Sequence, residues 1–313
     1  MTSQPYSSGL ISVASQREPR RRGQLGRNMP PEILFITTTD AAGNRRDDLV
    51  RLLSSIEATL AGRDWRMLLL MQCASAGQDR SVGIPANVDV EATPHKVSAS
   101  HARNLVLREA RGRGLLARMP LVAFPDDDCW YPEGTLERIL DLFEADPVLD
   151  FLFCRYASTP QSPTSLEARL PSVFNVAASA SSNTIFLRSR IVEAIGEFDE
   201  KLGLGTENNG GEDTDYALRA FRQSRKCRFV DRALVGHRDN SPQFRSRYFR
   251  GGLIAIARHA TVEPASLVLL LRKVAVGGFL VATRQMPSRE FRIALRAALS
   301  ARAEGRRSKG RLN

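Results

Sequence analysis

The sequence predicts an α/β fold with a largely parallel sheet, because apolar runs alternate with segments of helical periodicity along most of the chain. Ile33–Ile36 and Trp65–Met71 are typical of buried strands, and Asp47–Leu60 between them carries apolar residues at helical spacing. A strand, helix and strand of these lengths indicate a right-handed crossover between parallel neighbours. We expect this α/β sandwich to occupy residues 31–240.

The same alternation continues beyond the second strand. Val97–Ala110 predicts a helix, Leu121–Phe124 a buried strand that ends at a proline, and Leu136–Phe143 another helix. Phe151–Cys154 predicts a further strand. The three threonines after the first strand, beginning at Thr37, are expected to open a loop.

Charge and composition exclude several classes of protein. The 313 residues carry a net charge of +11, and the mean hydropathy of −0.25 is that of a soluble globular chain. The excess lies in residues 1–30, with a net +4, and residues 284–313, with a net +7. A neutral body does not favour a nucleic-acid partner, whereas basic tails suit an anionic membrane surface. We expect residues 1–30 to be a disordered basic arm.

The spacing of the cysteines and the absence of several catalytic motifs exclude further classes of protein. Cys73, Cys129, Cys154 and Cys227 stand singly, which predicts neither a zinc site nor a disulfide framework and favours a reducing cytoplasm. The amino-terminal residues lack the order of a signal peptide. The chain contains no GxSxG, HExxH or Walker motif, so hydrolase, zinc protease and P-loop kinase functions are disfavoured.

An acidic triplet, Asp126–Asp128, directly follows the predicted strand at Leu121. Open α/β sheets bind ligands at the carboxyl ends of their strands. In an extended segment Asp126 and Asp128 would face the same side, where a cation would relieve their repulsion. Oxygen ligands of this kind favour Mg²⁺ or Mn²⁺. The alternative is a solvated acidic turn before the next helix.

A second acidic group opens a helix after a glycine-rich loop. Glu212 and Asp213 fall in the first helical turn, where the helix dipole favours carboxylates, so capping is one explanation. The other is a general base presented on a rigid helix start behind a loop that can move. Asp215 and Arg219 are expected to form a surface ion pair. His237, at the end of another predicted strand, is either an ordinary loop residue or a third ligand that favours Mn²⁺.

The ordered set of segments resembles the family 2 glycosyltransferases, which have the GT-A fold, a Rossmann-like α/β/α sandwich, and use nucleotide-diphosphate sugars. The resemblance spans Ile33–His237. It rests on the strand ILFITTT, the segment Ser100–Asn104 before a helix, the run VAFPDDDCWYP, and GEFDEKLG followed by NNGGEDTDYALRA and VGH. It implies a nucleotide-diphospho-sugar transferase with a C-terminal helical extension.

The resemblance implies a role for each acidic residue. Asp126 and Asp128 match the DXD motif, which holds Mn²⁺ or Mg²⁺ against the donor diphosphate, with Asp126 near the ribose. His237 matches a histidine that completes the metal site in some members. Glu212 and Asp213 match the ED motif, whose aspartate deprotonates the acceptor hydroxyl for an inverting displacement.

The resemblance also implies nucleotide contacts for Thr37 and Arg103. Gln72 stands where members carry an acid that contacts the base of the nucleotide. Its amide can still donate and accept hydrogen bonds to a base edge. The resemblance implies a nucleotide-diphosphate sugar as donor, and a UDP-sugar is expected, although the missing acid counts against UDP.

Residues 241–313 contain an apolar run, Ala265–Ala282, followed by the basic tail. Arg272 and Lys273 interrupt this run, which makes it a poor membrane span. A helix lying in the plane of an anionic cytoplasmic leaflet is one interpretation. A helical hairpin packed on the catalytic domain is the other, and the two are compatible.

Together these features predict a metal-dependent inverting glycosyltransferase at the cytoplasmic face of the cell membrane. It would act on a glycan or lipid-linked acceptor in bacterial exopolysaccharide, capsule or cell-surface glycan assembly. The alternative is a non-catalytic nucleotide- or glycan-binding scaffold subunit, which the missing acid at Gln72 would suit. A sugar-nucleotide pyrophosphorylase is disfavoured, because its glycine-rich basic loop is absent between Thr37 and Asp47.

Overall fold

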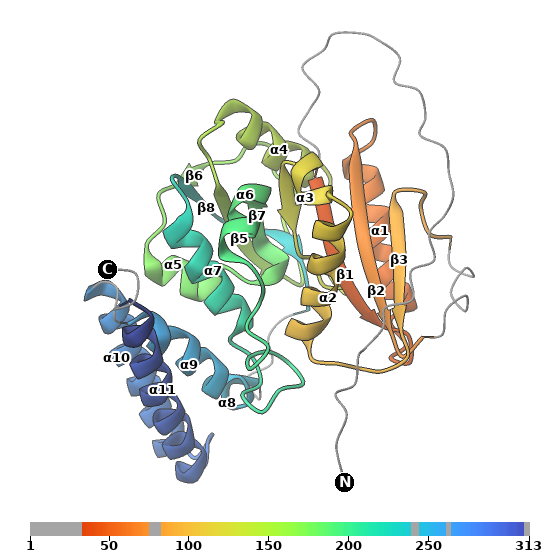
Figure 1. The fold of residues 1–313 in the computed structure, drawn as a ribbon. Helices are drawn as coiled ribbons and strands as arrows, with labels where there is room; N and C mark the ends of the chain where they lie inside the picture. The colour runs from red at the N-terminus through yellow and green to blue at the C-terminus, as the bar shows by residue number, and fades with distance from the viewer. Residues whose placement is uncertain (1–32, 75–82, 239–243, 261–263, 310–313) are drawn as a thin grey trace.

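The computed structural model describes residues 33–74, 83–238, 244–260 and 264–309, and the basic arm expected over residues 1–30 lies outside them. The described residues form an eight-stranded sheet in the order β3-β2-β1-β4-β7-β5-β8-β6 (Figure 1). The predicted α/β fold is confirmed. The strands are β1 Ile33–Asp40, β2 Trp65–Gln72, β3 Val88–Thr93, β4 Leu121–Ala123, β5 Phe151–Ala157, β6 Ala168–Arg169, β7 Ile185–Arg188 and β8 Cys227–Gly236.

Helices cover both faces of the sheet, because successive strand residues point to opposite sides. Leu34 and Leu68 pack into the core on one face, and Phe35 and Met67 into the core on the other. All four side chains are fully buried. The first face is covered by α2 (Ala99–Gly112), α3 (Leu115–Arg118), α5 (Val173–Ser179), α6 (Ser189–Ile195) and α7 (Glu212–Gln223), and the second by α1 (Arg46–Thr59) and α4 (Thr135–Ala145).

The sheet is mixed, so the prediction of a largely parallel sheet is wrong for part of it. β7 lies between β4 and β5 and is antiparallel to both, and the short β6 is antiparallel to β8. The crossover argument concerns only a strand, helix and strand in succession, and it says nothing of a short strand inserted later in the chain. Because β7 is antiparallel to both neighbours, β4 and β5 run in the same direction.

β1 is longer than the sequence predicted. It pairs with β2 residue by residue from Ile33 opposite Trp65 to Asp40 opposite Gln72. Thr37 therefore lies inside the strand, 1% exposed, and not in a loop after it. Threonine is β-branched and favours strands, so the three threonines continue the pairing with β2. The polar end of β1 is at Asp40.

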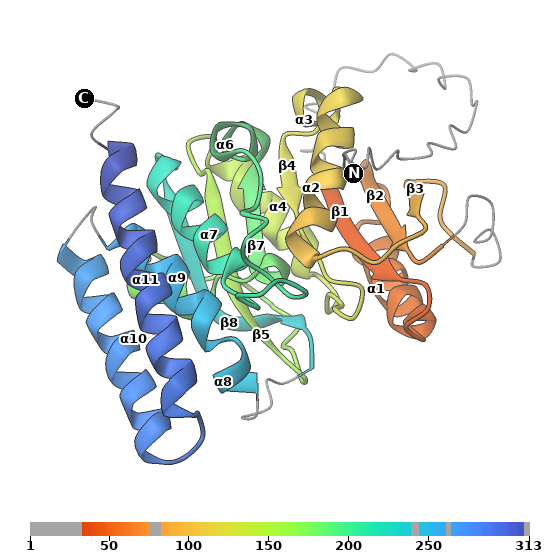
Figure 2. The same ribbon diagram turned by 60° about the horizontal axis from the view of Figure 1, so that its bottom comes forward.

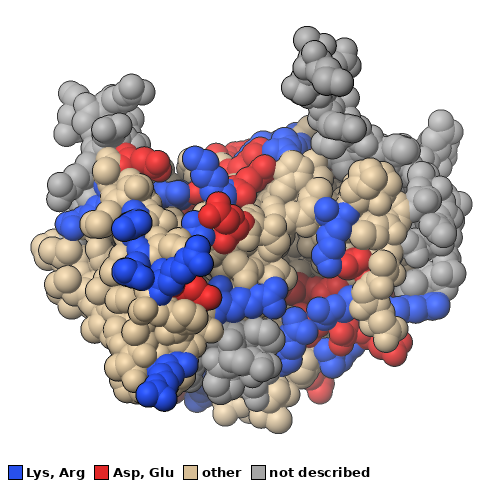
Figure 3. All heavy atoms as spheres, turned by 90° about the horizontal axis from the view of Figure 1, so that it is seen from below, with Lys and Arg blue, Asp and Glu red and all other residues tan. Residues whose placement is uncertain are grey.

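The carboxyl ends of β1, β2, β4, β5 and β8 meet at one edge of the sheet, because these strands run parallel. The acidic triplet follows β4, and His237 follows β8. The face of the molecule at this edge presents acidic side chains among basic ones (Figure 3). Chain segments far apart in sequence therefore bring their polar ends to one place.

Four helices follow the sheet: α8 Phe244–Arg247, α9 Phe249–His259, α10 Pro264–Ala282 and α11 Ser288–Lys309. α9 packs against α7, and α10 and α11 form an antiparallel pair beside α9 (Figure 2). Phe249 lies over Gly277, where an added Cβ would be 2.4 Å from its ring. The hairpin packing considered for this segment is thus present in the structure.

α10 also keeps a long exposed apolar face. By length and composition it is the one helix of the described residues that could cross a membrane, and 28% of its apolar window is buried. Val268, Leu271 and Phe279 are 54%, 60% and 62% exposed. Packing on α9 and α11 therefore leaves part of this helix without a protein partner.

Candidate active site

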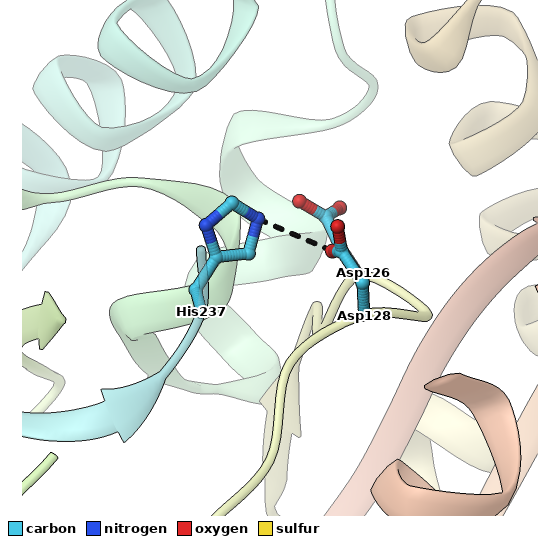
Figure 4. A group of neighbouring side chains, drawn as sticks. All are labelled: Asp126, Asp128 and His237. Carbon is cyan, nitrogen blue, oxygen red and sulfur yellow. Dashed lines mark ion pairs between the residues drawn. The ribbon is translucent and has the colours of Figure 1, made fainter. Parts of the chain in front are cut away.

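The three residues predicted to hold a metal converge. The ligand atoms of Asp126, Asp128 and His237 all lie within 4.8 Å of one another (Figure 4). The triplet is not extended as predicted. It forms a turn in which the Cys129 amide donates to the Asp126 carbonyl over 3.2 Å. The turn still directs the carboxylates of Asp126 and Asp128 to the same side. The imidazole comes from His237, the residue after β8.

A glycine brings His237 to the acidic turn. Trp130 and Gly236 pair as an antiparallel bridge, with N–H···O distances of 3.0 and 2.8 Å. A Cβ at Gly236 would lie 2.0 Å from the Trp130 ring, so no larger residue fits there without a shift. The Arg51 guanidinium covers the same ring at 4.1 Å. His237, the next residue along the chain, therefore depends on this contact for its place.

We expect Gly236→Ala to weaken Mn²⁺ binding about tenfold, as for other changes that misplace a metal ligand. The added methyl group overlaps the Trp130 ring and displaces the end of β8 that carries His237. Isothermal calorimetry with Mn²⁺ measures the effect. Gly112→Ala, where no atom lies within 4 Å of the new Cβ, is the control. Equal Mn²⁺ affinity in the two variants would contradict this prediction.

Cations surround Asp128. His237 Nε2 lies 3.2 Å from Oδ1, while Arg45 Nη1 and Arg238 Nη2 lie 3.1 and 3.3 Å from Oδ2. Burial opposes ionisation, but the His237 hydrogen bond and these positive charges outweigh it and hold the pKa of Asp128 well below its usual range. Asp128 is therefore an ionised acceptor, and a metal ion there would compete with both arginines.

The donor set fits a divalent cation. Two carboxylates and one imidazole converge from separate chain segments, which is a ligand combination that suits Mn²⁺-class ions better than Mg²⁺. The Asp126 amide donates to Asn183 Oδ1 over 2.7 Å and anchors the start of the turn. The ligands are thus held by their neighbours before any ion arrives.

Arg103 joins this group to the second acidic pair. Its guanidinium, 8% exposed, donates to Asp126 Oδ1 at 2.7 Å and lies 3.3 Å from Asp213 Oδ1 and 3.7 Å from Glu212 Oε1. Ser182 Oγ accepts from the same guanidinium at 2.9 Å and donates to Asp213 at 3.3 Å. One buried arginine thus fixes the spacing between the metal ligands and the candidate base.

The two carboxyl groups of the pair differ in access. The Glu212 side chain is 11% exposed and the Asp213 side chain 26% exposed. Burial, then the charge of Asp213, raises the pKa of Glu212 to about 7. Burial also raises the pKa of Asp213, against the opposing charge of Arg103. Asp213 is the member that a substrate can reach and that holds a proton more readily than a free carboxyl group.

The sequence missed Ser182 and Asn183 as parts of this site, and it did not separate Asp127 from the two aspartates beside it. Asp127 turns away from the metal group and accepts from Thr39 Oγ1 at 2.6 Å. Its burial raises its pKa to about 6. Ser182 and Asn183 lie in a short 3₁₀ helix, Ser182–Thr184, at the start of β7. A run of small polar residues before an apolar segment was the available signal.

Thr37 lies in β1, and Gln72 is the last residue of β2. Gln72 Oε1 accepts from the Val97 amide at 2.8 Å, so its carbonyl already holds the segment before α2. The Thr37 hydroxyl is buried and has no hydrogen-bond partner among the described residues. Asp40, opposite Gln72, binds Lys96 at 2.6 Å. The sequence analysis did not single out Asp40. It is the last residue of β1, whereas the strand was expected to end before Thr37.

The predicted surface pair of Asp215 and Arg219 is wrong as to its place. The two side chains do meet, at 2.9 Å, but Asp215 is 1% exposed and also contacts Arg258 and His259 of α9. Helical spacing identified the partner and could not identify the face, because α9 covers it from a distant part of the chain. The glycine-rich loop is held as well, since the Ala99 amide donates to the Leu204 carbonyl at 2.9 Å.

The mixed α/β sheet, with an acidic turn after a central strand and a carboxylate pair at a helix start, has the GT-A fold. Residues 77–190 match the family model described as Glycosyl transferase family 2. The comparison with curated protein sequences found no match.

Solved structures of TarS from S. aureus share the fold. The complex of TarS 1–349 with UDP is 15% identical, with a TM-score of 0.53, over 90% of this chain and 92% of that one. The complex with UDP-GlcNAc is 14% identical, with a TM-score of 0.52 and the same coverage. A further TarS structure, 16% identical with a TM-score of 0.56, matches 88% of this chain, which spans 55% of the TarS chain.

Proposed function

We propose that this glycosyltransferase is metal-dependent and inverting, and that it transfers a sugar from a nucleotide-diphosphate donor to an acceptor hydroxyl. The observation that carries the proposal is the placement of Arg103 between Asp126 of the metal group and Asp213 of the acidic pair. A cation site and a base linked by one rigid group are what a single-displacement transfer needs.

The residues have distinct roles in this reaction. Asp126, Asp128 and His237 would hold the cation, which would neutralise the charge that develops on the departing nucleoside diphosphate. Asp213 accepts the proton of the acceptor hydroxyl, whose oxygen then forms a bond to the anomeric carbon. The bond from that carbon to the diphosphate oxygen breaks with its electron pair, on the opposite face, so the configuration inverts. Arg103 keeps Asp213 oriented toward the site.

The donor we propose is a UDP-sugar, and the acceptor a glycan or lipid-linked glycan of the kind made in bacterial exopolysaccharide or capsule assembly. Support comes from the TarS complexes with UDP and UDP-GlcNAc, which share the fold. Gln72 and Arg103 border the place where the nucleotide would lie, at the ends of β2 and the start of α2.

Calorimetric titration with a panel of nucleoside diphosphates, with Mn²⁺ and with EDTA, tests the donor site. We expect metal-dependent binding of UDP over the other nucleotides, followed by release of UDP from a UDP-sugar when acceptor is present. Binding without turnover on any acceptor would contradict catalysis and favour a scaffold. Absence of binding to every nucleotide would contradict the site itself.

We further propose that the C-terminal helices attach the enzyme to the anionic cytoplasmic face of the membrane. Leu271 and Phe279 of α10 are exposed on the helix that is long and apolar enough to enter a bilayer. Arg292 and Arg296 are exposed on the neighbouring α11. An apolar face beside basic side chains is typical of a helix that lies in the membrane interface.

The double variant Leu271→Glu, Phe279→Glu should lose at least about tenfold in vesicle partition, since each side chain contributes roughly 2 kcal/mol when buried in an apolar phase. Co-sedimentation with phosphatidylglycerol vesicles measures this. Leu170→Glu, at a side chain 76% exposed on the catalytic part, is the matched control. Equal partition of both proteins, or equal binding to neutral phosphatidylcholine vesicles, would exclude the anionic membrane as partner.

A further inference from the structure

α9 touches the backbone of the loop that precedes the catalytic helix. A Cβ on Gly251 would lie 1.9 Å from the Gly210 carbonyl oxygen, and a Cβ on Gly211 would lie 2.3 Å from the Gly251 carbonyl carbon. Gly210 and Gly211 have φ of +96° and +87°, which only glycine adopts readily. The residue after Gly211 is Glu212. α9 therefore contacts the residues before α7 backbone to backbone at these glycines.

α9 also holds the far side of the same helical turn. Asp215, two residues after Asp213, accepts from His259 Nε2 at 3.0 Å and from Arg258 Nη1 at 3.2 Å. Burial opposes its ionisation, but His259, Arg219 and Arg258 hold the pKa of Asp215 well below its usual range. The carboxylate is therefore charged. Loss of one of its buried partners would leave part of this charge uncompensated, which is costly in free energy.

These two contacts bracket the acidic pair. Gly211 and Asp215 flank Glu212 and Asp213 in sequence and in the first turn of α7, and both are held by one helix. Arg103 contacts the pair from the other side, at the metal group. The position of Asp213 is therefore set by Arg103 on the side of the metal group and by α9, which contacts the residues flanking the acidic pair.

We propose that α9 is a positioning element for the catalytic carboxylates, with Gly251 and the Arg258–His259 pair setting where Asp213 lies relative to Arg103. The proposal rests on the proposed role of Asp213 as the base. It makes α9 a part of the catalytic apparatus, in addition to its role as the support on which α10 and α11 pack. α10 and α11 pack on α9, so the surface proposed to bind the membrane adjoins the helix that supports the base.

Two adjacent glycines provide a matched test. Gly251→Ala drives a methyl group into the Gly210 backbone, whereas a Cβ on Gly252 has Lys273 Nζ at 3.5 Å as its nearest atom, an ordinary contact. Both changes favour the helix equally by intrinsic propensity. We expect Gly251→Ala to lower kcat about a hundredfold, as displacement of a catalytic group by about an ångström does, and Gly252→Ala to keep the wild-type kcat.

The affinity for UDP with Mn²⁺ distinguishes positioning from general damage. The proposed donor and metal contacts come from β1, β2 and α2 and from the segments that follow β4 and β8, so Gly251→Ala should bind UDP within about twofold of wild type while kcat falls. Asp215→Asn, which keeps size and removes charge, should show the same split between kcat and UDP affinity. It carries the test if Gly251→Ala does not fold.

An unchanged kcat in both Gly251→Ala and Asp215→Asn would overturn the proposal. A parallel loss of kcat and UDP affinity would also overturn it, because it would indicate a purely structural role for α9. Failure of the proposed function looks different. In that case wild-type protein shows no metal-dependent UDP binding, or Asp213→Asn keeps full activity, before any glycine variant is considered.

Discussion

Asp213→Asn is expected to lower the rate of sugar transfer by about a thousandfold, within the range that a general base contributes. The amide keeps the size of the side chain but cannot take the proton of the acceptor hydroxyl. UDP release in the presence of acceptor measures the rate. Because the metal group is intact, calorimetric UDP affinity with Mn²⁺ should stay close to wild type.

The pH dependence of the wild-type rate provides a second readout. Burial raises the pKa of Asp213, and a base works only when it is deprotonated, so the rate should rise with pH as this carboxyl group loses its proton. Asp213→Asn should remove that rise. Glu207→Gln, at a side chain 82% exposed on the preceding loop, is the control and should keep both rate and pH profile. A variant at Asp213 that kept more than about a tenth of the rate would exclude it as the base.

Asp128→Asn is expected to weaken metal-dependent UDP binding about a hundredfold or more, because it removes a charged ligand from the convergent group. The neighbouring change Asp127→Asn is the matched control. Asp127 points toward Thr39, whose hydroxyl can still donate to an amide oxygen, so UDP affinity should change by less than about threefold. Calorimetry with Mn²⁺, repeated in EDTA, measures both.

The comparison of these two aspartates is informative because they are adjacent in the chain but have different partners. Asp128 contacts His237, Arg45 and Arg238, while Asp127 accepts a hydrogen bond from Thr39. Equal losses in the two variants would mean that the turn had been disrupted as a whole. Equal retention would mean that Asp128 holds no metal.

Much of the site could be predicted because its residues follow local signals. Asp126 and Asp128 come after an apolar strand, His237 after another, and the acidic pair after a glycine-rich loop. Strand ends that share an edge bring such residues together without further information. The structure places Asp126, Asp128 and His237 in one group and links it through Arg103 to Asp213.

Other parts of the site could not be predicted from local signals. Ser182 and Asn183 reach the site only because β7 inserts between β4 and β5. Gly236 is needed only because Trp130 packs on it. From helical spacing Asp215 was predicted to be an exposed partner of Arg219, but in the structure α9 covers it.

The sequence by itself determined the apolar strands and amphipathic helices, the acidic residues at their ends, and the apolar character of α10. Periodicity records which face of an element is buried, and this is a property of neighbouring residues in the chain. The tertiary structure alone decided which element covers each face and in which direction each strand pairs. Those choices depend on contacts between residues far apart in sequence, and here they place α9 against α7, which begins with Glu212 and Asp213, and β7 in the middle of the sheet.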